Sequence, residues 1–240
     1  MLRLPRALTG SFMLNKIVNI FLFTIVAACQ TEDIDDSSIL FKDSHQSDTQ
    51  IEESLEDTQE LEEEEEVPDS LTDFFQVGPY EIVESLRTAS VTNCGEMSYT
   101  IYSPQGISDP TVVVLGHGFA RGAGVMSGWA EQLSSWGVEV LLPTLCHYNI
   151  FSGVDHEMNG YNMKELASLH GSSRVIYAGH SAGGLAAIIA ASQDPNALGV
   201  VGLDTTDTED IPGIPDNIGQ GYASSITCPS FYLMGEPSTC

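Results

Sequence analysis

Basic residues are scarce in this chain, and their scarcity excludes several functions. Of 240 residues only 8 are Lys or Arg, against 34 Asp or Glu, so the formal net charge is −26 at pH 7. Direct nucleic-acid binding is excluded, because it needs clustered cations to neutralise phosphates. Anionic membrane surfaces repel such a chain unless something anchors it.

Long apolar runs are also absent. The one N-terminal run, residues 17–28, is shorter than the roughly 20 residues of a membrane-spanning helix. Arg3, Arg6 and Lys16 precede it, and a basic start followed by about a dozen apolar residues is typical of a secretory signal. We therefore expect export, with an N-terminal anchor helix as the alternative.

The apolar run ends in small residues followed by Cys29. This ending resembles the bacterial lipoprotein signal, in which the thiol accepts a lipid and becomes the N-terminus. The resemblance implies that residues 1–29 are a signal ending at a lipidated Cys29. It also implies a membrane-anchored bacterial lipoprotein facing the periplasm or the cell surface, since several acyl chains hold a protein firmly. A secreted protein cut nearby is the alternative.

Residues 30–73 carry most of the charge excess. Residues 31–73 hold 18 acidic residues against the single Lys42, and residues 62–66 are five consecutive glutamates. Such a segment cannot bury enough apolar surface to offset its ordering entropy, and its charges repel one another. We expect a disordered tether between the lipid and a domain that spans residues 74–240.

Apolar patterning in the domain alternates between strands and helices. Continuous β-branched runs are typical of strands buried on both faces, and apolar residues at helical spacing indicate the helices. The expected strands cover residues 98–102 (as an edge strand), 111–115, 138–142, 174–178, 198–203 and 230–234, and the expected helices cover 126–136, 162–170 and 182–191. This order predicts an α/β fold, a mostly parallel sheet with helices on both faces.

The chemistry is concentrated in the motif G-H-S-A-G at residues 179–183, directly after an expected strand and before an expected helix. This is the context of a nucleophile elbow, which presents a serine on a strained turn. Ser181 is the expected nucleophile, and side chains at Gly179 or Gly183 would collide with neighbouring backbone. A plain strand-to-helix turn is the alternative.

A second glycine-flanked turn, G-H-G-F at residues 116–119, follows another buried strand. Acyl transfer needs two backbone N–H donors where the oxyanion forms. We assign these donors to the amides of Phe119 and Ala182. His117 lies between two turn glycines, so we expect it to shape the loop rather than to act as a base.

Together these motifs resemble the α/β-hydrolase fold over about residues 95–235. Within that fold the chain resembles the group of chlorophyllases, platelet-activating-factor acetylhydrolases, dienelactone-hydrolase-like proteins and polyester hydrolases. The resemblance implies a serine, an acid and a histidine in that chain order. It also implies a lipase-like serine esterase that acts on carboxylic esters with an apolar part.

The acid has several candidates. Asp204 ends an expected strand 23 residues after Ser181, where chlorophyllases and the acetylhydrolases place their acid, so it inherits the role. Asp207 is next, and Glu236 is restricted by the proline that follows it. The alternative for Asp204 is a strand-end cap.

The histidine of the triad is missing from its expected place. None of the six histidines follows residue 180; they are His45, His117, His147, His156, His170 and His180. We therefore expect the last strand, the last helix and the catalytic histidine beyond residue 240, which makes this chain a fragment. A broken or repurposed hydrolase is the alternative.

Other reactive residues suggest no metal and no organic cofactor. The neighbours of His156 in D-H-E point in different directions, so we expect no metal site there. Excluding Cys29, the four cysteines allow three full pairings: Cys94, Cys146, Cys228 and Cys240. Cys228 and Cys240 flank one strand, and we expect them not to pair with each other.

Three functions remain in view. A serine esterase is favoured, with Trp129, Phe119, Tyr148 and Phe151 as candidate apolar walls. A non-catalytic surface binding protein that keeps the hydrolase cleft would explain the missing histidine. An acyltransferase would use the same serine with an alcohol acceptor.

Overall fold

The computed structural model describes Ile17, Phe74 and residues 76–149, 151, 153–207 and 217–235. The expected signal apart from Ile17, the lipid-bearing Cys29 and the acidic tether lie outside these residues. Glu236 and Cys240 also lie outside them. Within the described part of the chain, no helix has both the length and the apolarity that crossing a membrane requires.

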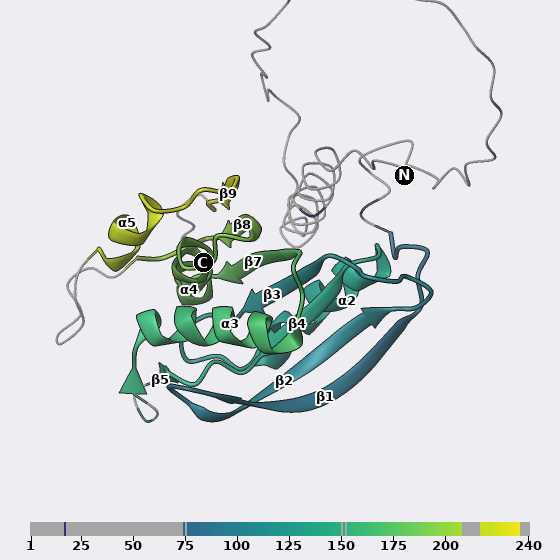
Figure 1. Ribbon diagram of the computed structural model, residues 1–240, viewed down its shortest axis with the longest axis horizontal. Helices are drawn as coiled ribbons and strands as arrows, with labels where there is room; N and C mark the ends of the chain where they lie inside the picture. The colour runs from purple at the N-terminus through teal and green to yellow at the C-terminus, as the bar shows by residue number, and fades with distance from the viewer. Residues whose placement is uncertain are drawn as a thin grey trace, which may run out of the picture.

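A seven-stranded sheet in the order β1-β2-β4-β3-β7-β8-β9 forms the centre of the domain (Figure 1). β1 and β2 form an antiparallel hairpin, β2 pairs antiparallel with β4, and every later pairing is parallel. The strands are β1 (Ile82–Val91), β2 (Gly95–Pro104), β3 (Val112–Gly116), β4 (Glu139–Pro143), β7 (Val175–His180), β8 (Ala197–Leu203) and β9 (Ser230–Leu233). This confirms the expected α/β-hydrolase-like sheet.

Helices cover both faces of the sheet. The helices are η2 (Ala123–Met126), α2 (Ser127–Ser135), α3 (His156–His170), α4 (Ala182–Ser192) and α5 (Ile218–Ala223). A two-stranded hairpin, β5 (Tyr148–Asn149) and β6 (Gly153–Val154), leads into α3. Figure 1 shows α3 and α4 beside each other on one side of the sheet.

The sheet divides the apolar core in two, because alternate residues of each strand face opposite sides. Val113, Leu115 and Leu203 pack with α2 in one cluster, whereas Val114 and Tyr177 pack with α3 and α4 in the other. The central strands are therefore apolar throughout. β3 has all five residues buried, as its continuous valine run predicts.

The edge of the sheet differs from the expectation. Residues 98–102 belong to β2, which is an inner strand, and β1 takes the edge position that sequence reasoning missed. Most residues of β1 are exposed, and its apolar residues are interspersed with polar ones, so its sequence gives no buried run to recognise. Its ten-residue pairing with β2 defines it instead.

The third helix also begins earlier than expected, at His156 rather than near residue 162. Asp155 caps it, since its carboxylate accepts a hydrogen bond from the N–H of Met158. Gly160 lies inside this helix, where a Cβ would approach Cγ2 of Ile189 to 2.6 Å. Glycine usually disfavours a helix, but here the close packing of α3 on α4 leaves no room for a side chain at this position.

Candidate functional site

Ser181 occupies the sharp turn between β7 and α4. Its backbone has φ 53° and ψ −121°, a conformation that L-residues rarely adopt and that stores strain. The turn is held from both sides, because the Ser181 N–H donates to the carbonyl of Leu203 at 2.9 Å and the Ser181 carbonyl accepts from Gly184 at 2.9 Å. The surrounding sheet and helix therefore maintain the strained serine.

Glycines on either side make this turn possible. A Cβ at Gly179 would lie 2.2 Å from the carbonyl oxygen of Gly183, and a Cβ at Gly183 would lie 2.4 Å from that of Gly116. Both contacts are with backbone, which cannot rotate away. The collisions expected from the motif are therefore confirmed, and they bring the elbow against the end of β3.

The loop after β3 lies against the nucleophile. A Cβ placed at Gly118 would be 3.5 Å from Cβ of Ser181 and 3.2 Å from Nδ1 of His180. Neither Phe119 nor Ala182 uses its N–H in a hydrogen bond to any residue that the structure describes. Ala182 is also the first residue of α4, where the helix dipole favours negative charge. Both N–H groups are therefore without a hydrogen-bond partner among the described residues.

His117 is fully buried, and both its ring nitrogens have partners. Nδ1 lies 2.9 Å from the carbonyl oxygen of Gly118, and Nε2 accepts from the N–H of Leu145 at 3.0 Å. This pattern places the proton on Nδ1. Burial lowers the pKa of His117, which keeps the ring neutral. The residue thus shapes the loop, as its sequence position indicated.

Asp204 follows β8 directly and is exposed at the site. Its N–H donates to the carbonyl of Leu233, and its φ is 46°. The turn that it starts lies beside the nucleophile, because Oγ1 of Thr206 is 3.5 Å from Oγ of Ser181. Thr206 was not singled out by sequence reasoning; its place just after a strand end was the available signal.

Asp207, the second acid candidate, has a different set of contacts. Its carboxylate accepts from the N–H groups of Gly219 at 3.0 Å and Gln220 at 3.2 Å. Both donors lie in the first turn of α5, so Asp207 ties that helix to the loop after β8. Asp204 and Asp207 therefore both lie beyond the carboxyl end of β8, and of the two, Asp207 is the one that holds α5.

No histidine ring in the described residues forms a hydrogen bond to Ser181. His147 contacts the carbonyl of Asn93 through Nε2 at 2.8 Å, and His180 lines the adjoining cavity. His156 is buried at the start of α3, with its ring in edge contact with that of Phe119. The proton acceptor that the motif calls for is therefore not assembled among these residues.

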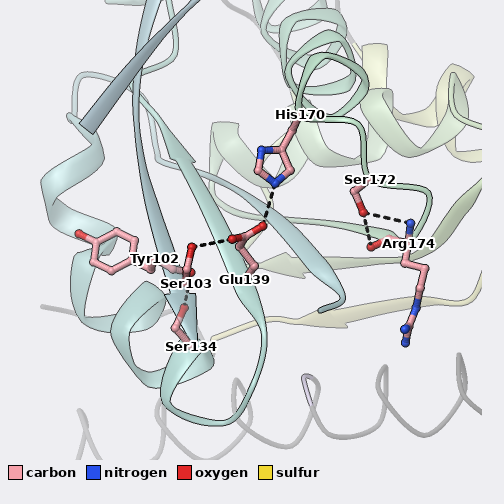
Figure 2. Close-up of polar contacts among 7 residues, drawn as sticks. All are labelled: Tyr102, Ser103, Ser134, Glu139, His170, Ser172 and Arg174. Carbon is pink, nitrogen blue, oxygen red and sulfur yellow. Dashed lines mark hydrogen bonds and ion pairs between the residues drawn. The ribbon is translucent and has the colours of Figure 1, made fainter. Parts of the chain in front are cut away.

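A serine, a carboxylate and a histidine do meet elsewhere, as Figure 2 shows, but in the wrong arrangement for catalysis. Glu139 lies in the middle, accepting from Ser103 at 2.5 Å and bonding Nε2 of His170 at 2.7 Å. The His170 hydrogen bond is the main reason that the pKa of Glu139 is lowered. Glu139 begins β4, at the opposite end of the parallel strands from Ser181, so this cluster is structural.

A cavity of about 580 Å³ opens beside the elbow, on the side of the sheet covered by α2. It is lined by Arg121, Val125, Met126, Trp129, His180, Leu203, Asp204, Leu233, Met234 and Gly235. Of the four residues expected as apolar walls, only Trp129 lines this cavity. Phe119 is 43% exposed and Phe151 is 93% exposed, whereas Tyr148 packs edge-on against His117.

A disulfide supports the loop that carries the partner of His117. Cys94, after β1, is bonded to Cys146, after β4, and Leu145 precedes the bridge. This is one of the pairings that the sequence left open, and Cys228 is a free thiol. In the residues with described positions, no three His, Cys, Asp or Glu side chains gather closely enough to hold a metal ion.

No protein-family model matches this chain, and no curated protein matches it. Among the solved structures that match is an epoxide hydrolase, CorEH without ligand, at 20% sequence identity and a TM-score of 0.44. The match covers 57% of this chain and 47% of that one, so it spans about half the length of the epoxide hydrolase. At this level of likeness the match says nothing about activity.

Proposed function

We propose that the domain is a serine hydrolase that acts on carboxylic esters. The observation that carries the proposal is the strained Ser181, held between β7 and α4, together with two amides, of Phe119 and Ala182, that have no hydrogen-bond partner among the described residues. A serine placed in this way can attack a carbonyl while preorganised N–H donors stabilise the developing negative charge.

The proposed reaction has two stages. Ser181 Oγ attacks the ester carbonyl, and the amides of Phe119 and Ala182 hold the oxyanion. The alcohol leaves with a proton supplied by a histidine, and water then hydrolyses the acyl-enzyme. Asp204 is the proposed residue that orients this histidine. The cavity beside the elbow suits an apolar part of the ester, because Val125, Met126 and Leu233 are among its walls.

Labelling with a fluorophosphonate probe tests the proposal. The probe reacts only with an activated serine, so the full-length protein, with the histidine that the mechanism requires, is expected to be labelled at Ser181, and its Ser181→Ala variant is not. Ser172→Ala is a matched control, because Ser172 is remote from the elbow and, among the described residues, its hydroxyl bonds only Arg174. Absence of labelling in the wild-type protein would overturn the proposal.

One observation favours a second candidate, a non-catalytic surface binding protein: no described histidine pairs with Ser181. This candidate predicts ligand binding without turnover, unchanged in Ser181→Ala. An acyltransferase shares the elbow, and product analysis with an added alcohol acceptor separates it from a hydrolase. For all three we propose an exported lipoprotein, with the domain displayed on its acidic tether from a lipid on Cys29.

A further inference from the structure

The two sides of Ser181 differ in chemistry. On the side of α2 lies the largely apolar cavity, whereas on the side of α3 the loop residue Phe119 packs against His156. The two rings have centroids 6.3 Å apart at 79°. Because Phe119 directly follows Gly118, and Gly118 lies against Ser181, this second side adjoins the nucleophile.

His156 is the unusual group on this side. It is only 6% exposed, and its Nδ1 is enclosed without a hydrogen-bond partner. The other ring nitrogen, Nε2, also has no hydrogen-bond partner among the described residues. It does not belong to the enclosed unpaired atoms, so we take it as the ring nitrogen that solvent can reach. Buried polar groups are nearly always paired, so an unpaired imidazole packed against Phe119, on the loop that lies against Ser181, calls for a partner.

The surroundings of His156 define the chemistry of that partner. Burial lowers the pKa of His156 against the opposing effects of Asp155 and Asp207, so the ring is neutral at pH 7. A neutral imidazole offers one donor and one acceptor. The two nearby carboxylates and the net charge of −26 repel an anionic group such as a phosphate. A hydroxyl group on a ligand can pair with Nε2, the ring nitrogen that is not enclosed, in either tautomer, because it both donates and accepts.

We propose that His156, with the partly exposed Phe119 beside it, binds a hydroxyl on the alcohol part of the substrate through Nε2. Together with the apolar cavity across Ser181, this makes the preferred substrate an apolar acyl ester of a polyhydroxy alcohol rather than a simple alkyl ester. The inference rests on the proposed function in treating the bound ester as a substrate. The binding preference for a hydroxyl-bearing ligand does not depend on turnover.

Two ethers that cannot be hydrolysed test the preference. 1-O-Octylglycerol carries two hydroxyl groups, and octyl ethyl ether carries none while keeping the same octyl chain. Isothermal titration of the wild-type chain is expected to show about tenfold tighter binding of 1-O-octylglycerol, the effect of one well-made hydrogen bond. His156→Phe is expected to abolish this difference, and His156→Gln, which keeps a hydrogen-bonding amide, is expected to retain most of it.

His170→Phe is the matched control, since it removes a histidine at the other end of the sheet (Figure 2) and should leave the preference intact. Failure of the wild-type chain to bind either ether, equal binding of the two, or an unchanged preference in His156→Phe would each overturn the inference. If His156→Phe does not fold, a His156→Gln chain that folds and has lost the preference would equally overturn it, because that change retains hydrogen bonding. Labelling of Ser181 on the same samples judges the hydrolase proposal separately.

Discussion

Replacing Gly183 with alanine perturbs the contact between the elbow and the neighbouring strand. The new Cβ would lie 2.4 Å from the carbonyl oxygen of Gly116 and 2.5 Å from that of His117. Ordinary carbon–oxygen contacts are about 1 Å longer, so either α4 or the end of β3 must move by roughly that distance. All of β3 and nearly all of α4 are buried, so neither can shift without disturbing the core.

The expected cost is at the upper end of the range for overpacking, about 3 kcal/mol of the free energy of unfolding. For a chain of this size that lowers the melting temperature by roughly 6–12 °C. Urea denaturation and thermal melting of the full chain measure the effect. Labelling of Ser181 by the fluorophosphonate should also fall in the variant at temperatures where it remains folded, because the loop carrying Phe119 is displaced.

Gly128→Ala is the matched control. Gly128 is an exposed residue of α2, and a Cβ there meets nothing within 4 Å. Alanine is the better helix former, so this variant should be unchanged or more stable by up to about 1 kcal/mol. If Gly183→Ala and Gly128→Ala unfolded at the same midpoint as the wild type, the tight approach of α4 to β3 would be refuted.

Two further predictions concern stability away from the elbow. The pKa of Glu139 is lowered from its ordinary 4.5, mainly by the His170 hydrogen bond, so the stabilisation is present above that value and is lost as the pH falls. Glu139→Gln should therefore cost about 1 kcal/mol near neutral pH and little once the pH has fallen below the lowered pKa, and a constant difference in urea titrations would contradict this. Replacing Cys94 and Cys146 by serine opens a loop with a sequence separation of 52 and should lower the free energy of unfolding by about 2–4 kcal/mol. Cys228→Ser, which changes a free thiol, should leave the free energy of unfolding unchanged. Equal melting temperatures of the wild type, the Cys94/Cys146 double variant and Cys228→Ser would count against the bridge.

The buried parts of the sheet were predictable because their signals are local. The apolar runs of β3, β4, β7 and β8 occur where they were expected, and the glycines around Ser181 predicted the elbow and its collisions. Strands buried on both faces need continuous apolar sequence, and a tight turn needs glycine whatever the rest of the chain does. The roles assigned to Ser181 and Asp204 stay predictions.

Other features depend on residues distant in the sequence, and there the predictions were wrong or incomplete. β1 has few buried residues, and only its pairing with β2 makes it a strand. Gly160 is helical because α4 packs against it, and Cys146 pairs with Cys94 because the turn after β1 meets the loop after β4. None of these partners could be read from a local pattern.

The α/β class, the strand–elbow–helix unit and the acidic character of the chain follow from local sequence, because periodicity, turn glycines and charge act through near neighbours. The surroundings of Ser181 depend instead on the packing of segments that are far apart in the chain. This packing places the apolar cavity on the α2 side and leaves Nδ1 of His156 without a partner on the α3 side. It also makes the Asp207 carboxylate accept hydrogen bonds from α5. These outcomes follow from how the sheet edge gathers the ends of distant strands, which no single segment of the chain encodes.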